Sequence, residues 1–134
     1  MKQLFGLMLI VVFFMVISYT GCKDQITGSD LDKKVIPDSN VSYSEYIQPV
    51  FNLKCANAGC HNDSELAGGI SLTSCANTTA DPSIVFPGEP DNSRLIWSVE
   101  GIGNFPMPPA GYPPLTVNQI KGVRTWIKEG AQCN

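Results

Sequence analysis

The seven residues Cys55-Ala56-Asn57-Ala58-Gly59-Cys60-His61 are the stretch on which the fold of this chain depends, and they hold its only histidine. Four residues separate the two cysteines, and His61 follows Cys60 directly. Two cysteines at this spacing would by themselves most often form a disulfide or stay unpaired. The adjacent imidazole changes that interpretation, because thiolates and imidazoles are metal ligands. The stretch is therefore a candidate binding site.

A second candidate ligand lies far downstream, at Met107 in Phe105-Pro106-Met107-Pro108-Pro109. Prolines also occupy positions 113 and 114. Because proline restricts the backbone, this segment should be a stiff, extended loop that can hold a thioether in place. The alternative is a methionine that fills a gap in the core, which is the usual fate of this residue. The other methionines all belong to the N-terminal segment: Met1, Met8 and Met15.

Residues 1–21 have the features of a lipoprotein-type signal peptide. Lys2 precedes an apolar run from Leu4 to Ile17, which is shorter than the roughly 20 residues that span a bilayer. Small residues then precede Cys22, which is similar to a bacterial lipoprotein cleavage site at which that cysteine is acylated. An uncleaved anchor and a soluble secreted product are the alternatives. All three place the rest of the chain outside the cytoplasm.

Residues 22–40 are mainly polar, and we expect them to form a flexible tether between a lipid and one domain at residues 41–134. The chain has 12 acidic and 9 basic residues, a formal net charge of −3. This balance argues against nucleic acid as a partner, which would require a basic stripe.

Two helices are predicted by capping boxes, at Ser42-x-x-Glu45 and Thr116-x-x-Gln119. The first should kink or restart at Pro49 and deliver Cys55 at its end. The second has an apolar face and should stop at Gly130. That face comprises Ile120, Val123, Trp126 and Ile127.

A third, short helix is expected at residues 92–99, capped by Asp91 or Asn92 and ended by Gly101 and Gly103. Residues 62–90 should be a long loop. Its buried candidates are Ile70, Leu72, Ile84, Val85 and Phe86. No segment alternates with period two, so we predict an all-α domain of three to four short helices with long irregular loops.

Taken in order, residues 41–132 resemble the single-haem c-type cytochrome domain of an extracytoplasmic bacterial subgroup with four residues between the haem cysteines. The segments Ile47-Gln48-Pro49-Val50-Phe51, Pro87-Gly88-Glu89-Pro90 and Met107-Pro108-Pro109 carry this resemblance besides the cysteine stretch. It implies one covalent haem c, held by Cys55 and Cys60, with His61 and Met107 as axial ligands. A cytochrome c-like fold would then wrap round the haem.

The resemblance further implies an electron carrier rather than an enzyme, with redox proteins as partners. If Cys22 is acylated and Cys55 and Cys60 hold haem, Cys75 and Cys133 are left, and an oxidising compartment would permit a disulfide between them; two free thiols are the alternative. Candidate haem-wall residues, each equally explicable as core, are Trp126, Trp97, Phe51 and Leu72. Candidate propionate contacts are Tyr112 and Arg124.

Two other functions stay open at this point. A haem-based sensor or peroxidase-like enzyme would follow if Met107 dissociates from the iron. A structural lipoprotein would follow if zinc or disulfides staple the chain, since Cys55, Cys60, His61 and either Cys75 or Cys133 could supply four zinc ligands.

Overall fold

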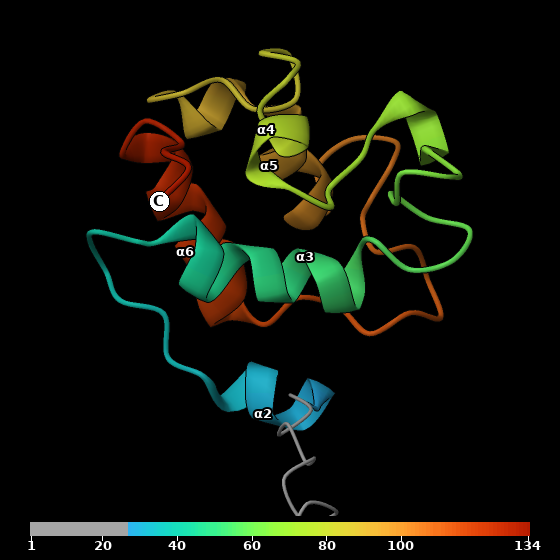
Figure 1. The fold of residues 1–134 in the computed structure, drawn as a ribbon, viewed down its shortest axis with the longest axis horizontal. Helices are drawn as coiled ribbons and strands as arrows, with labels where there is room; N and C mark the ends of the chain where they lie inside the picture. The colour runs from blue at the N-terminus through green and yellow to red at the C-terminus, as the bar shows by residue number, and fades with distance from the viewer. Residues whose placement is uncertain (1–26) are drawn as a thin grey trace, which may run out of the picture.

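The computed structural model describes residues 27–134, and within this range the chain is helical and contains no strand (Figure 1). The predicted signal peptide at residues 1–21 and the predicted lipidation site Cys22 lie outside the described residues. The predicted all-α class is confirmed, and the described residues alone form five α-helices where three to four were expected. The α-helices are α2 (Gly28–Lys33), α3 (Gln48–Lys54), α4 (Cys75–Thr78), α5 (Arg94–Val99) and α6 (Val117–Lys128). Single turns of other helix types are η1 (Tyr43–Ile47, π), η2 (Ala67–Gly69, 3₁₀) and η3 (Pro90–Asn92, 3₁₀).

The helix that leads to Cys55 begins and restarts as predicted. The Ser42 side chain accepts a hydrogen bond from the Glu45 amide, 3.3 Å away, and so caps η1. Pro49 lies in the first turn of α3, where a missing amide hydrogen costs nothing. The apolar face is buried and forms the centre of the core, with Ile47 and Phe51 fully covered.

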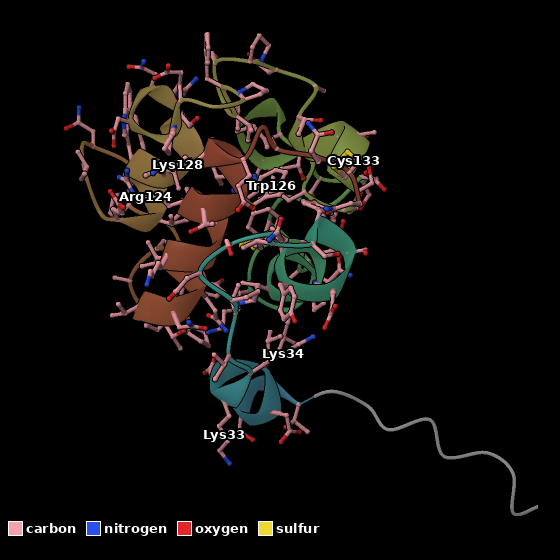
Figure 2. All side chains as sticks on the ribbon, turned by 90° about the vertical axis from the view of Figure 1, so that its left-hand side faces the viewer. Lys33, Lys34, Arg124, Trp126, Lys128 and Cys133 are labelled. Atoms are coloured by element: carbon pink, nitrogen blue, oxygen red, sulfur yellow. A yellow bond between two sulfur atoms is a disulfide. The ribbon has the colours of Figure 1, made fainter. Side chains whose placement is uncertain are left out.

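Helix α6 is the longest helix of the described residues, and its predicted ends are confirmed. Thr116 and Gln119 form both halves of the capping box, with N–O distances of 3.2 and 2.9 Å. At the other end, Gly130 adopts a positive φ of 99° and its amide donates to the Ile127 carbonyl. Figure 2 shows Arg124 and Lys128 on one side of α6 and Trp126 on the side that faces Cys133.

Residues 27–41, which we call the N-terminal strap, pack against the domain, so the expectation of a flexible tether through residue 40 was wrong. Thr27 caps α2, and the strap buries Leu31 and Ile36 to 3% and 4% exposure. The Ile36 amide donates to the Asn118 side chain on α6, 2.9 Å away. Leu31 lies between two aspartates, whereas Ile36 follows Val35, which is 78% exposed, so apolar character in the sequence does not show which of these residues is buried.

Residues 62–90 were predicted to be a long loop, but they contain two short helices, η2 and α4. Ser74 caps α4 by accepting from the Asn77 amide. Phe86 was expected to be buried, but it is 47% exposed. The expected cap of α5 was also wrong: Asp91 and Asn92 belong to η3, and Ser93 is the N-cap residue.

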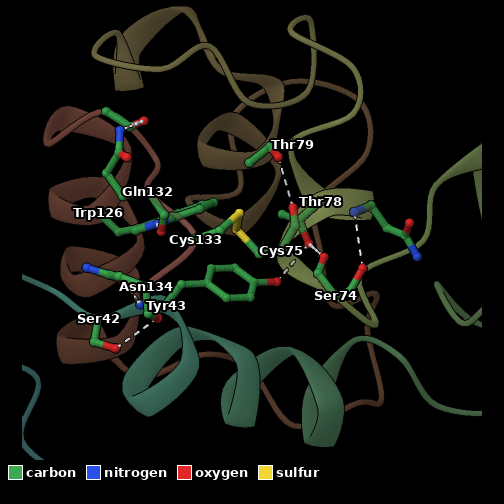
Figure 3. Close-up of a disulfide and its surroundings, with 12 residues drawn as sticks. Ser42, Tyr43, Ser74, Cys75, Thr78, Thr79, Trp126, Gln132, Cys133 and Asn134 are labelled. Carbon is green, nitrogen blue, oxygen red and sulfur yellow. Dashed lines mark hydrogen bonds between the residues drawn. A yellow bond between two sulfur atoms is a disulfide. The ribbon is translucent and has the colours of Figure 1, made fainter.

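A disulfide joins Cys75 in α4 to Cys133 near the end of the chain, with the two Cα atoms 5.6 Å apart (Figure 3). Two aromatic residues pack beside this bond. The Tyr43 hydroxyl and the Thr78 hydroxyl share a hydrogen bond of 2.8 Å, and the Tyr43 and Trp126 rings are 5.0 Å apart. Burial raises the pKa of Tyr43 to about 12, although the bond to Thr78 opposes the shift. The disulfide therefore joins α4, in the middle of the chain, to the C-terminal segment that follows α6.

Within residues 27–134, no helix combines the length and the apolar character that a membrane crossing requires.

Candidate functional site

A cavity of about 300 Å³ brings together three of the residues singled out in the sequence: Cys55, His61 and Met107. Most of its wall is apolar. The remaining lining residues are Ala67, Gly68, Ile70, Leu72, Ile84, Arg94, Leu95, Ser98, Val99 and Phe105. A concave, mainly apolar cavity with a few polar groups has the character of a cofactor or small-molecule site.

The end of α3 and the turn that follows it position Cys55 and His61. The Cys55 amide donates to Phe51, and the His61 amide donates back to the Cys55 carbonyl at 3.0 Å. The His61 carbonyl then accepts from the Leu72 amide at 2.9 Å. Between the cysteines, Gly59 has a φ of 78°, which an L-residue adopts only under strain. The four intervening residues thus form a closed loop that returns His61 to the cavity.

The His61 ring nitrogen Nδ1 is buried and has no hydrogen-bond partner within the part of the chain that the structure describes. An unsatisfied buried polar atom is costly. A buried ring nitrogen without a partner, on a side chain that lines a cavity, is consistent with an imidazole that binds a ligand in that cavity.

The two cysteines of the stretch differ in their surroundings. Burial raises the pKa of the Cys55 thiol to about 12, and the neighbouring Cys60 adds to the shift, while Lys54 opposes it. Cys55 is therefore a protonated thiol at neutral pH, unlike the low-pKa thiols of redox catalysts. Cys60 is half-buried and is absent from the cavity wall; its Sγ lies 3.7 Å from the Ala58 carbonyl oxygen.

Met107 reaches the cavity because its loop is attached to α5. Its amide donates to the Ser98 carbonyl near the end of that helix, at 2.8 Å. Helix α5 itself contributes Leu95, Ser98 and Val99 to the cavity wall. The same helix therefore supplies both the wall and the support for the methionine.

Most of the residues predicted as propionate contacts or haem-wall residues lie outside the cavity wall. Arg124 is paired with Glu100 and Asp91, with nitrogen–oxygen distances of 2.9 and 2.5 Å, and these bonds raise its pKa. Neither Arg124 nor Tyr112 lines the cavity. Of the four candidate wall residues, only Leu72 does so. Phe51 and Trp126 are buried in the core, and Trp97 is exposed.

Sequence reasoning missed Arg94, Ser98 and Phe105 in the cavity wall. For the first two, a signal was present: residues 94, 95, 98 and 99 lie on one face of a helix. Their helix had been considered only for its buried apolar residues. Phe105 is adjacent to the Met-Pro segment, and nothing in its own pattern indicated a cavity.

A zinc site formed with Cys75 or Cys133 has no support. Those two cysteines are bonded to each other. In addition, residues 27–134 contain no group of three or more His, Cys, Asp or Glu side chains arranged to hold a metal ion.

Part of the chain matches a known protein family. A family model described as Planctomycete cytochrome C matches residues 58–111. The matched segment is less than half of the chain; it includes Cys60, His61 and Met107 and leaves out Cys55. No curated protein and no solved structure matches the chain. The family match supports a cytochrome c-like domain with a general haem-binding and electron-transfer role.

Proposed function

We propose that this protein is an extracytoplasmic electron carrier with one covalent haem c, attached through Cys55 and Cys60 and ligated by His61 and Met107. The observation that carries the proposal is that Met107 lines one mainly apolar cavity together with Cys55 and His61, although it lies far from both in the sequence. The family match at residues 58–111 points to the same chemistry.

The residues present fit a haem. An imidazole and a thioether are suitable axial ligands, and the unpartnered Nδ1 of His61 is consistent with a ring held for a bound group. The free thiols are Cys55 and Cys60, since the other two cysteines within the described residues form a disulfide. Leu72, Leu95 and Val99 provide an apolar wall.

When bound, haem supplies a one-electron Fe(II)/Fe(III) couple. His61 and Met107 would hold it as ligands, and the apolar wall of the cavity would exclude water. Because both axial positions have a candidate ligand, we propose a carrier rather than an enzyme. The redox partners would be other proteins.

We also propose that the domain is held at a bacterial membrane by a lipid on Cys22. The apolar run before Cys22 and the small residues next to it support this. The Cys75–Cys133 disulfide is typical of an oxidising compartment outside the cytoplasm.

The test is haem staining after denaturing electrophoresis, on full-length protein expressed with a cytochrome c maturation system. We expect wild type to retain the stain and Cys55→Ser/Cys60→Ser to lose it. The matched control is Cys75→Ser/Cys133→Ser, which removes the same number of sulfur atoms away from the cavity and should retain the stain.

A wild-type protein without denaturation-resistant haem would refute covalent attachment. Equal staining of both double variants would show that other groups hold the haem.

A further inference from the structure

Arg94 is the only Lys, Arg, Asp or Glu among the described residues that line the cavity. It is the first residue of α5 and shares a helix face with Leu95, Ser98 and Val99, which also line the cavity. Its side chain is exposed at the surface, whereas Leu95 and Val99 are buried. A single cation thus stands at the solvent-facing border of an apolar cavity.

Several other cations of the domain are engaged elsewhere, and Lys33 and Lys128 do not line the cavity. Lys54 contacts Asp32 at 2.6 Å, Lys121 contacts Asp38 at 2.7 Å, and Arg124 is paired with two carboxylates. Over residues 27–134, Arg94 has no ion pair and no side-chain hydrogen bond. The guanidinium is therefore free to pair with a group that enters the cavity.

The charge of Asp81 interacts with that of Arg94, but the Asp81 carboxylate is hydrogen-bonded to Ser83. The pKa of Asp81 is lowered mainly by hydrogen bonds from Ser83, and Arg94 adds only a smaller effect. The Ser83 amide lies 2.8 Å from an Asp81 oxygen. Asp81 therefore does not form a hydrogen bond with the Arg94 guanidinium, whose N–H groups can donate to another carboxylate.

We propose that Arg94 is the positioning residue that pairs with a haem propionate and raises the midpoint potential of the iron. The inference rests on the proposed function. A planar guanidinium matches a carboxylate in two parallel hydrogen bonds. A fixed positive charge near the iron favours the state with one more electron, and a partly buried cavity screens that charge less than water does.

The test is an equilibrium redox titration of haem-loaded protein, with dithionite as reductant and ferricyanide as oxidant. In Arg94→Gln, we expect the ratio of reduced to oxidised protein at a fixed solution potential to fall about tenfold, which for one electron is about 59 mV. Arg94→Lys keeps the charge and should stay within about threefold of wild type. The matched control is Lys121→Gln, which removes the same charge from an exposed pair outside the cavity and should not shift the midpoint.

An unchanged midpoint in Arg94→Gln, with normal haem stain and visible spectrum, would overturn the role of Arg94 and leave the proposed function intact. An equal shift in Lys121→Gln would also overturn it, since net charge alone would then explain the effect. If Arg94→Gln yields no haem-loaded protein, recovery of haem in Arg94→Lys supports the charge role, and failure of both variants refutes it. Absence of haem from wild type would instead refute the proposed function.

Discussion

The Lys54 ammonium nitrogen lies 2.6 Å from an Asp32 carboxylate oxygen and thereby joins α3 to the N-terminal strap. The same nitrogen donates to the Pro114 carbonyl at 2.8 Å and to Gln119 on α6 at 3.0 Å. The Lys54 side chain is only 4% exposed. The residue before Cys55 is therefore the point at which the strap, α6 and the end of the methionine loop meet.

Replacing Asp32 by asparagine should destabilise the domain by about 1–3 kcal/mol, since the buried ammonium of Lys54 would lose its anionic partner. The estimate is kept below that of a fully buried pair because the Asp32 side chain is 42% exposed. Asp38→Asn is the control, because it breaks an exposed pair with Lys121 and should cost at most about 1 kcal/mol. Urea unfolding measures both; equal losses would contradict a special role for Lys54.

The contribution of Asp32 should disappear in acid. Its pKa is lowered from 3.8, chiefly by the hydrogen bond from Lys54 and further by Gln119, while desolvation opposes the shift. A lowered pKa gives stability that is complete above the unfolded value and is lost as pH falls through the folded value. The stability gap between wild type and Asp32→Asn should thus stay constant from about pH 7 to 5 and shrink below 3.8. A gap that did not decrease as the pH fell below 3.8 would contradict this.

Gly122→Ala should destabilise the domain, although alanine normally favours a helix by up to about 1 kcal/mol. A Cβ at this position would lie 2.7 Å from two side-chain carbons of Ile36 and push the strap away from α6. We expect a net loss of about 1–2 kcal/mol from such overpacking. The double variant Gly122→Ala/Ile36→Ala should lose less stability than the sum of the losses in the two single variants, because alanine at position 36 lacks the two carbons at 2.7 Å. Additive losses in thermal unfolding would argue against the close contact.

Loss of the Cys75–Cys133 disulfide should cost about 4 kcal/mol, which is the loop-closure entropy expected for residues 58 apart in sequence. Cys75→Ser/Cys133→Ser should have a lower unfolding midpoint in urea than wild type without reductant. Added reductant should lower the midpoint of wild type and leave the double variant unchanged. A reductant effect of equal size on both proteins would locate the sensitivity elsewhere.

Met107→Leu should keep covalent haem and lose the weak sulfur-to-iron band of the ferric protein in the near infrared, since leucine has similar volume and no sulfur. The midpoint potential should fall, and reduced protein should bind carbon monoxide faster. Phe105→Leu is the control within the same loop and should keep the band. Retention of the band in Met107→Leu would exclude this methionine as a ligand.

Features that depend on a few neighbouring residues were predictable. The capping box at Thr116, the restart at Pro49 and the stop at Gly130 were all confirmed. In each case a residue within one helical turn either forms a hydrogen bond with the free backbone groups at the helix end or, as with proline, has no amide hydrogen to satisfy. The candidate site at Cys60 and His61 was also visible in the sequence, because the two residues are adjacent.

Features that depend on docking were not predictable. The strap has too few apolar residues to show a period, and it is stabilised by partners on α3 and α6. Arg94 and Arg124 look alike in the sequence, yet one is unpaired beside the cavity and the other is held by Glu100 and Asp91. Their difference arises from which face of α5 or α6 each occupies.

By itself, the sequence determined the all-α class, the ends of α3 and α6 and the set of side chains available as ligands, because capping, proline and helical spacing act over a few residues. Only the tertiary structure decided that Cys55, His61 and Met107 share one cavity, and that Arg94 is the one unpaired cation that residues 27–134 contribute to its wall. The reason is that their proximity depends on the packing of α3, α5 and the methionine loop, whose contacts join residues far apart in the chain.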